Sequence, residues 1–351
     1  MKARRIPRPE RRFWEALVAV SPNASFFLTP EFAQIAEAAY GTPTELFAFE
    51  CEDGARVLLP ARRIVGGRFR TYVAPGGGLP GGLLSDAPLV PERGAAVLHA
   101  LAKIPDAAFR LTLDPREDLR LPPAPERSLR RDRFFVLDLS EGFARTETER
   151  FAKDFREGCR RALRRGVRVS LERGPHAYEA FASLHAAGSQ GWEAESQQPN
   201  ALFSACAAQA TVPGTPLELV LARDSAGEPV AGILGVRRGD TWTCWLAAMD
   251  RRARPLAPSS AAYRFAVEHA CAGGARRLLL GASGGIASVE AFKRSLGAES
   301  IDFNLHVEVR GTLREGLRRV REFGRWVHAV ARGTRGQGAV PPGGAGLGGV
   351  A

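Results

Sequence analysis

The order in which helix and strand patterns alternate is the feature that most constrains the fold of this chain. In the second half, apolar periodicity predicts a helix over 146–165, a strand over 167–171, and helices that begin at Pro175 and Pro199. Three strands follow over 217–223, 229–237 and 241–248, then a helix from Ser259 or Ser260 to Cys271, a strand over 276–280, a helix over 288–296 and a strand over 301–309. Interleaved helices and strands of this kind predict an α/β (α+β) fold with mixed sheets.

The first half of the chain repeats much of this order. Helices are predicted over 9–19 and 30–40, strands near 45–50, 56–64 and 69–73, a helix over 91–103, and strands over 108–113 and 134–139. Ser140, Glu141 and Gly142 have the chemistry of a turn between the two halves. We therefore expect two similar tandem units, residues 1–142 and 143–309.

A basic amphipathic helix is predicted over 310–332. Its apolar stripe recurs at steps of three and four residues: Leu313, Leu317, Val320, Phe323, Val327 and Val330. The arginines between them lie largely off the stripe, where they are placed to meet RNA phosphates or an anionic membrane surface; alternatively the apolar face simply packs on the protein. Residues 333–351 contain eight Gly and two Pro and are predicted to be disordered.

The positive charge of the chain is local. The net charge is +11, and the 49 basic residues comprise 4 Lys and 45 Arg. Segments 1–12, 145–173 and 310–335 hold more than all of the positive excess. Local basicity of this kind favours contact with a polyanion, although arginines that merely solvate helix faces would give the same pattern.

Several classes of protein are disfavoured by what the sequence lacks. It has no run of 18 apolar residues, and the apolar run that follows the basic start is too short for a signal peptide, which predicts a cytoplasmic protein. The five Cys contain no C-x-x-C pair and the six His no H-x-x-x-H pair, so we expect neither a disulfide framework nor a metal site. The glycines at 76, 78 and 81 lie between prolines with no helix after them and are interpreted as a loop.

Three stretches of the second half resemble the GNAT superfamily of N-acyltransferases. They are Lys153 to Val167, a basic helix that ends in Gly and a strand; Gln198-Pro199 followed by Phe203; and Leu280 to Gly285, a glycine-rich turn that leads to Ala291-Phe292-Lys293-Arg294-Ser295-Leu296-Gly297-Ala298-Glu299. The doubled unit is similar to the Fem family, which builds peptide bridges with amino acids taken from aminoacyl-tRNA, and to acyltransferases of cell-envelope and natural-product pathways. The resemblance covers most of 145–305.

The resemblance implies transfer of an aminoacyl or acyl group to an amine, with Lys293 and Phe292 at the catalytic centre. Helical spacing places Phe292 on a buried face and Lys293 at the edge of that face. In such a site the lysine stabilises the oxyanion of the transition state. The chain has only 4 Lys against 45 Arg, so a lysine at this position is weak independent support for a catalytic role. The alternative is an ordinary solvated lysine.

Further residues are candidates for substrate binding. A tight turn with Gly281, Ser283 and Gly285 lets a backbone approach a substrate, or merely connects a strand to a helix. Four arginines at helical spacing are placed to hold a phosphate group, unless they only solvate their helix: Arg156, Arg160, Arg161 and Arg164. The general base stays unassigned among Glu193, Glu195, Glu290 and Glu308.

No resident cofactor is expected, because aminoacyl-tRNA or acyl-CoA would act as a co-substrate. Residues 251–258 lack the glycines with which CoA-dependent relatives hold the pyrophosphate, which disfavours CoA in this unit. The expected partners are tRNA and an amine acceptor, either a small molecule or an envelope precursor, with peripheral membrane contact. The alternatives are an acyl-CoA-dependent N-acetyltransferase that acts on a sugar, lipid precursor or metabolite, and a non-catalytic protein that binds RNA or membranes.

Overall fold

The computed structural model describes residues 1–22, 24–64, 70–75, 79–114, 121, 124–125, 127–190 and 197–310, with the backbone alone over 303–306. Outside the described residues lie 311–332 of the helix predicted over 310–332, the predicted tail over 333–351, Glu193 and Glu195. Arg310 itself ends a strand rather than starting a helix.

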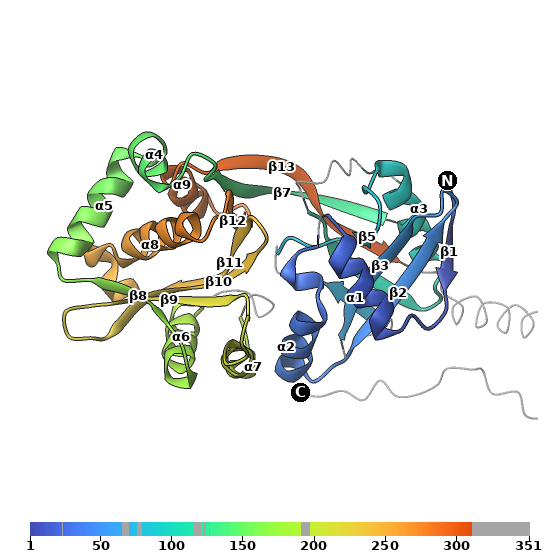
Figure 1. Ribbon diagram of the computed structural model, residues 1–351, viewed down its shortest axis with the longest axis horizontal. Helices are drawn as coiled ribbons and strands as arrows, with labels where there is room; N and C mark the ends of the chain where they lie inside the picture. Colours follow the sequence, from blue (N-terminus) through green and yellow to red (C-terminus); the bar gives the residue numbers. More distant parts are fainter. Residues whose placement is uncertain are drawn as a thin grey trace, which may run out of the picture.

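One mixed sheet runs through the described part of the chain (Figure 1). Its strands lie in the order β1 (Ala3–Ile6), β2 (Thr44–Cys51), β3 (Arg56–Ile64), β4 (Arg70–Ala74), β6 (Ala107–Thr112), β13 (Glu299–Arg310), β7 (Arg127–Asp138), β12 (Arg277–Ala282), β11 (Thr241–Met249), β10 (Pro229–Arg238), β9 (Leu217–Arg223) and β8 (Arg168–Glu172), and β5 (Leu84–Ser85) pairs with β3. The predicted α/β class and mixed sheet are therefore confirmed.

Two units with the same strand pattern make up this sheet. In the first, β1 to β4 are antiparallel neighbours and β4 pairs in parallel with β6. In the second, β8 to β11 are antiparallel neighbours and β11 pairs in parallel with β12. The duplication that the sequence predicts is present in the strand order.

The last strand of each unit completes the sheet of the other unit. β7 ends the first unit but pairs with β12 of the second, whereas β13 ends the second unit but pairs with β6 of the first. β7 and β13 also pair with each other, and they form the long antiparallel ribbon that joins the two units in Figure 1. The boundaries at 142 and 309 stay a prediction, and neither strand is confined to its own unit.

Helices cover the two faces of the sheet. The first unit contains α1 (Arg11–Val20), the 3-10 turn η1 (Phe26–Leu28), α2 (Pro30–Tyr40) and α3 (Pro91–Ala102). The second contains α4 (Phe143–Arg145), α5 (Lys153–Arg164), α6 (Pro175–Gly188), α7 (Asn200–Ala210), the 3-10 turn η4 (Arg251–Leu256), α8 (Pro258–Ala272) and α9 (Ala287–Ser295). In Figure 1, α5, α8 and α9 lie on one side of the second unit's sheet, and α6 and α7 lie on the other.

The single helix predicted over 146–165 is interrupted. A π-helical turn covers Thr146–Arg150, residues 151 and 152 are extended, and α5 starts at Lys153. The backbone N–H of Ala152 donates to the carbonyl of Ser295 at the end of α9 (2.8 Å), and the side chain of Phe151 is buried. The helix therefore breaks to satisfy a contact with a segment more than 140 residues away, which local periodicity does not report.

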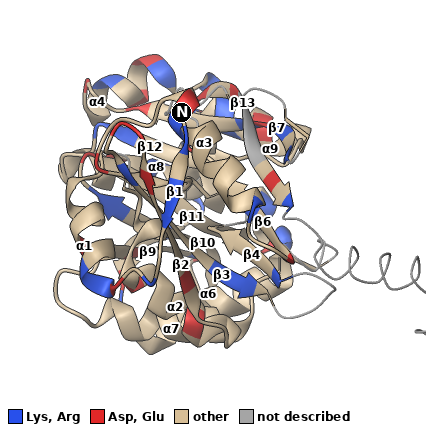
Figure 2. Ribbon diagram, turned by 90° about the vertical axis from the view of Figure 1, so that its right-hand side faces the viewer, with Lys and Arg blue, Asp and Glu red and all other residues tan. Residues whose placement is uncertain are grey.

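Aromatic packing and polar contacts join the two units. The ring of Trp245 in β11 lies edge-on to Phe27 and Phe32, with centroid distances of 5.5 Å each. The guanidinium of Arg238 in β10 donates to the carbonyl of Ala24 (2.6 Å). Figure 2, which looks at the first unit, shows basic and acidic residues interspersed on that side of the molecule. The units are thus held by core-like contacts as well as by the shared strands.

Candidate active site

A fork in the sheet lies between β11 and β12. The two parallel strands pair from Thr241 opposite Arg277 to Thr243 opposite Leu279, and beyond these residues β11 stays with β10 whereas β12 stays with β7. The strands therefore part toward their carboxyl ends, and η4, α8 and α9 begin beyond those ends. Openings at the carboxyl ends of parallel strands, beside helix N-termini, are where α/β sheets generally bind ligands.

Lys293 on α9 reaches β12 at this fork. Its side chain is buried, with 7% exposed, and its ammonium donates to the carbonyls of Gly281 (3.0 Å) and Ala282 (2.9 Å). The ammonium also lies over the ring of Phe135 in β7, 5.3 Å from the centroid. Two of its three N–H donors have backbone partners, and among the described residues the third has no hydrogen-bond acceptor.

Burial lowers the pKa of Lys293 to about 8, although Cys244, Asp132 and Glu290 act in the opposite direction. At neutral pH most of the side chain is therefore still charged. The sequence placed Lys293 at the edge of the buried face, and that prediction is wrong: Lys293 is the buried residue of α9, and Phe292 is half-buried. Two backbone carbonyls of β12 draw the ammonium inward, and helical spacing alone does not reveal them.

Aromatic rings surround Phe292. It lies edge-on to Phe155 of α5 and to Tyr263 of α8, with centroid distances of 6.0 and 5.2 Å. The Tyr263 hydroxyl lies 3.4 Å from the sulfur of Cys244 in β11, and burial raises the pKa of both groups. Cys244 is therefore a neutral thiol rather than a nucleophilic thiolate. These rings fix α9, and with it Lys293, against α5 and α8.

The glycine-rich turn is built on Ser283. Its hydroxyl donates to Glu290 (3.0 Å) and accepts from the backbone N–H of Gly285 (3.2 Å). Gly281 and Gly285 have φ of +71° and +76°, which other residues rarely adopt. The turn thus needs its glycines for its shape, and the Ser283 hydroxyl is committed to holding the turn on α9.

Glu290 is held as a carboxylate. Its side chain accepts from the guanidinium of Arg133 in β7 (2.7 Å) as well as from Ser283, and these bonds, the Arg133 bond first, lower its pKa. A carboxylate stabilised in this way is a weak base. Glu308, also open as a base from the sequence, pairs with Arg310 at the far end of β13. The structure therefore offers no base among the described glutamates of that set.

The four arginines of α5 have different surroundings. The guanidinium of Arg156 donates to the carbonyls of Thr148 and Phe151 (2.8 Å each), which end the preceding helical turn. Its Nη1 group is thus committed to the backbone, whereas no hydrogen bond of Nη2 or Nε to a described residue is found, so a phosphate contact of Arg156 stays a prediction. The other three, Arg160, Arg161 and Arg164, are exposed.

Those three arginines adjoin a second basic segment. α5 crosses the N-terminus of α8 closely, because a Cβ on Gly158 would lie 2.7 Å from the Ser260 hydroxyl, and α5 also contacts η4. η4 exposes Arg251 and Arg254. Arg252 of η4 is exposed too but pairs with Asp250 (2.8 Å). We call the other exposed arginines of the two segments the α5/η4 basic surface: Arg160, Arg161, Arg164, Arg251 and Arg254. It borders the N-terminus of α8, at the carboxyl end of β11.

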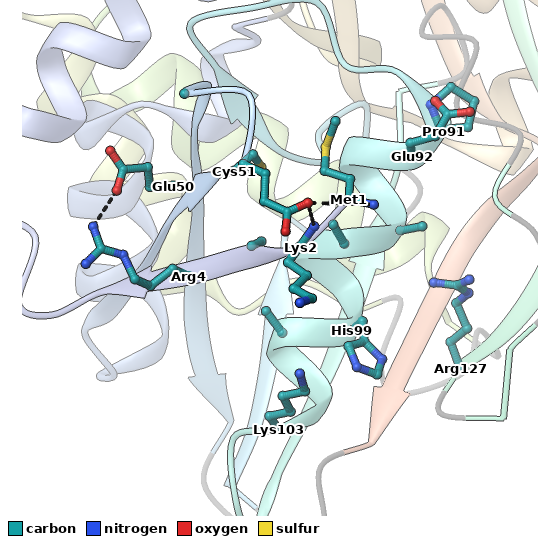
Figure 3. A pocket seen from close by; sticks show the side chains of 16 residues that line it. Met1, Lys2, Arg4, Glu50, Cys51, Pro91, Glu92, His99, Lys103 and Arg127 are labelled. Atoms are coloured by element: carbon teal, nitrogen blue, oxygen red, sulfur yellow. Dashed lines mark hydrogen bonds and ion pairs between the residues drawn. The ribbon is translucent and has the colours of Figure 1, made fainter.

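Two cavities were considered as sites. One, of about 470 Å³, adjoins the glycine-rich turn and is lined by Gly284, Gly285 and Glu290 together with residues of β7 and β13. A larger one, of about 1120 Å³, lies between β1 and α3 in the first unit, where Lys2, His99 and Lys103 project into it (Figure 3). No residue of the sequence motif lines the larger cavity, so the fork and the smaller cavity form the candidate site.

Some residues of this site were missed from the sequence. Asp132 and Arg133 come from the part of β7 that precedes the strand predicted over 134–139, and Phe135 lies inside that predicted strand but was not expected at the site. The run Arg130-Arg131-Asp132-Arg133 directly before an apolar strand was a signal that could have drawn attention to them. No group of three or more His, Cys, Asp or Glu suited to a metal ion occurs among the described residues.

Comparison with known families decides the class of the second unit. Residues 149–294 match the family model described as an acetyltransferase (GNAT) domain. The second unit is a GNAT-type acyltransferase domain. The match spans the α5 helix, the fork, the glycine-rich turn and Lys293. The superfamily that the sequence resembles is therefore confirmed.

Solved structures share the doubled fold of the whole chain. FemX is 14% identical and superposes with a TM-score of 0.64 over 92% of this chain and 100% of its own. L-PGS from Bacillus licheniformis (14%, TM-score 0.52, 86% of this chain and 92% of its own) and a tandem GNAT protein from the clavulanic acid biosynthesis pathway (14%, 0.51, 88% and 98%) are also similar. No curated protein matches the sequence. The chain thus has the Fem-like tandem GNAT fold.

Over the described ranges, no helix combines the length and the apolar character that crossing a bilayer requires.

Proposed function

We propose that this protein transfers an aminoacyl group from aminoacyl-tRNA to an amine acceptor, with Lys293 at the catalytic centre. The observation that carries the proposal is the buried Lys293 ammonium, which is held at the fork by two carbonyls and whose third N–H has no acceptor among the described residues. Phe292 and its aromatic neighbours shape the pocket around the reacting carbonyl.

The reaction needs one site of positive charge. The lone pair of a neutral amine forms a C–N bond to the carbonyl carbon of the aminoacyl ester, and the π electrons of the carbonyl move to its oxygen. The third N–H of Lys293 stabilises that oxyanion. When the carbonyl re-forms, the ester C–O bond breaks; the amine nitrogen gives up one proton and the departing oxygen of the ribose gains one. The products are an amide and a free hydroxyl.

Three observations support tRNA as the donor. The α5/η4 basic surface lies on segments that contact the N-terminus of α8, and it can hold phosphates of a polyanion whose acylated end enters the site. Residues 251–258 contain no glycine for a CoA pyrophosphate loop, and form η4 and a left-handed Ala257 instead. The whole-chain fold is that of FemX, a member of the family that the sequence resembles. Because charged tRNA is a cytoplasmic substrate, the proposal also places the protein in the cytoplasm, in cell-envelope or natural-product synthesis.

An acyl-CoA donor is the second candidate. The observation that favours it is the shared fold with the tandem GNAT protein, a structure described as being without AcCoA. The same oxyanion chemistry at Lys293 would then release a thiol.

The test is to incubate the full-length protein and a panel of amines with tRNAs that carry labelled amino acids, and separately with labelled acetyl-CoA. We expect label to pass from tRNA to an amide. Transfer from acetyl-CoA alone would establish the second candidate, and transfer from neither, with salt-sensitive binding of tRNA or liposomes, would show a non-catalytic binding protein. Lys293→Met should lower kcat by about 100-fold. Lys153→Met, which alters a side chain that is 80% exposed, is the matched control.

A further inference from the structure

The cavity of about 470 Å³ beside the glycine-rich turn lies where the sheet is irregular on both sides of β7. On one side, the register of β12 shifts between Leu279 and Gly281; on the other, that of β13 shifts between Phe303 and His306. Bulges of this kind redirect side chains and are frequent beside active sites. The stretch of β7 between them carries the charged residues that line the cavity: Arg130, Arg131, Asp132 and Arg133.

Both signs of charge are available in this cavity. Arg133 is committed to Glu290 (2.7 Å). Arg130 and Arg131 are exposed, and no ion pair links them to any residue in the described ranges. The carboxylate of Asp302 in β13 is also exposed and lines the same cavity. Two guanidinium groups and a carboxylate thus face one space without neutralising one another at hydrogen-bonding distance.

The cavity adjoins the catalytic centre proposed above. The carbonyls that hold Lys293 belong to Gly281 and Ala282, and the next residue, Ser283, bonds to Glu290 on the cavity wall. The Ser283 hydroxyl is also 3.4 Å from Asp132 Oδ1. A molecule in the cavity therefore lies against the turn that positions Lys293.

We infer that this cavity binds the amine acceptor, and that the acceptor is a small zwitterion such as an amino acid or the end of a peptide. Asp302 holds the ammonium, and Arg130 and Arg131 hold the carboxylate. A ligand of one sign would leave the opposite charges of the cavity without partners, whereas a zwitterion satisfies both. The volume lies within the range of small-molecule sites, about 300–1,000 Å³. The inference rests on the proposed acyl transfer for its role, but the binding itself does not require it.

The test is calorimetric titration of the full-length protein, without any acyl donor, with L-lysine and with cadaverine, which has the same chain and amines but no carboxylate. We expect L-lysine to bind more tightly than cadaverine. The Arg130→Ala/Arg131→Ala double variant should weaken L-lysine binding about tenfold and leave cadaverine binding unchanged, whereas Asp302→Asn should weaken both about tenfold. Arg165→Ala and Asp154→Asn, exposed residues of the α5 region, are the matched controls.

The results separate the two proposals. Binding that follows this pattern without any acyl transfer would support the cavity and reject the proposed function. Alternatively, the protein could transfer an acyl group to an amine that the wild type, the double arginine variant and Asp302→Asn all bind with the same affinity. That result would support the function and overturn the cavity assignment. Absence of L-lysine binding, or equal affinities for L-lysine and cadaverine, would also overturn it.

Discussion

Replacement of Lys293 by Met should change how the stability of the protein depends on pH. The pKa of this lysine is about 8 in the folded protein, against an ordinary value of 10.5. Between these values the unfolded chain binds a proton that the folded protein does not, so the free energy of unfolding rises with pH. The penalty for burying the charge is complete below the folded pKa and is relieved as pH rises toward 10.5. A methionine cannot titrate and lacks this dependence.

The magnitude follows from the shift. Integration from pH 7 to pH 10 gives a gain of about 2 kcal/mol for the wild type that Lys293→Met does not share. At pH 7 the two should differ little: the variant escapes a charge-burial penalty of about 3 kcal/mol, but it leaves the carbonyls of Gly281 and Ala282 without their donor, at about 1–3 kcal/mol each. The wild type should therefore become the more stable of the two as the pH increases.

Urea unfolding of both proteins at several pH values from 7 to 10 measures this difference. Groups remote from residue 293 titrate equally in both proteins and cancel in the comparison. Lys153→Met should run parallel to the wild type, because that side chain is 80% exposed. Parallel curves for the wild type and Lys293→Met would refute the argument, since they would mean that Lys293 keeps an ordinary affinity for its proton in the folded protein.

Three further predictions concern catalysis, donor binding and packing. If the charged form of Lys293 is required, kcat/KM of the wild type should decline as pH rises through about 8. The pH–rate profile of Lys293→Met should lack this decline. Exchange of Arg160 and Arg164 for Ala should weaken tRNA binding and reduce its salt dependence by about two counterions, measured by filter binding across salt; an unchanged slope would remove α5 from the donor site. Gly158→Ala should destabilise the protein by about 1–3 kcal/mol in urea unfolding, because its Cβ would meet the Ser260 hydroxyl at 2.7 Å; wild-type stability would show that α5 can shift away.

The bounds of several helices and strands could be predicted from the sequence, but contacts between residues far apart in the chain could not. The predicted bounds of α2, β3 and β9 coincide with the structure, because a proline at the start of α2 and strict apolar patterning are local signals. The break before α5 depends on a carbonyl at the end of α9, and the burial of Lys293 depends on two carbonyls of β12. Periodicity predicts the face of its own helix or strand on which a residue lies. It does not predict which distant backbone group that residue contacts.

Each unit contributes its last strand to the sheet of the other unit, β7 to the second and β13 to the first. This exchange decides which part of the chain can form the candidate site. Residues 149–294 match the GNAT domain, yet β7 lies outside this range and supplies Phe135 beneath Lys293 and Arg133 beside Glu290. A fragment of residues 143–310 would leave the β7-facing edge of β12 without its partner strand, and unpaired edges favour aggregation. We expect a fragment of 127–310, which keeps β7, to be soluble with native-like circular dichroism, and the 143–310 fragment to aggregate in sedimentation experiments. A monomeric, folded 143–310 fragment would show that the GNAT domain completes its own sheet without the first unit.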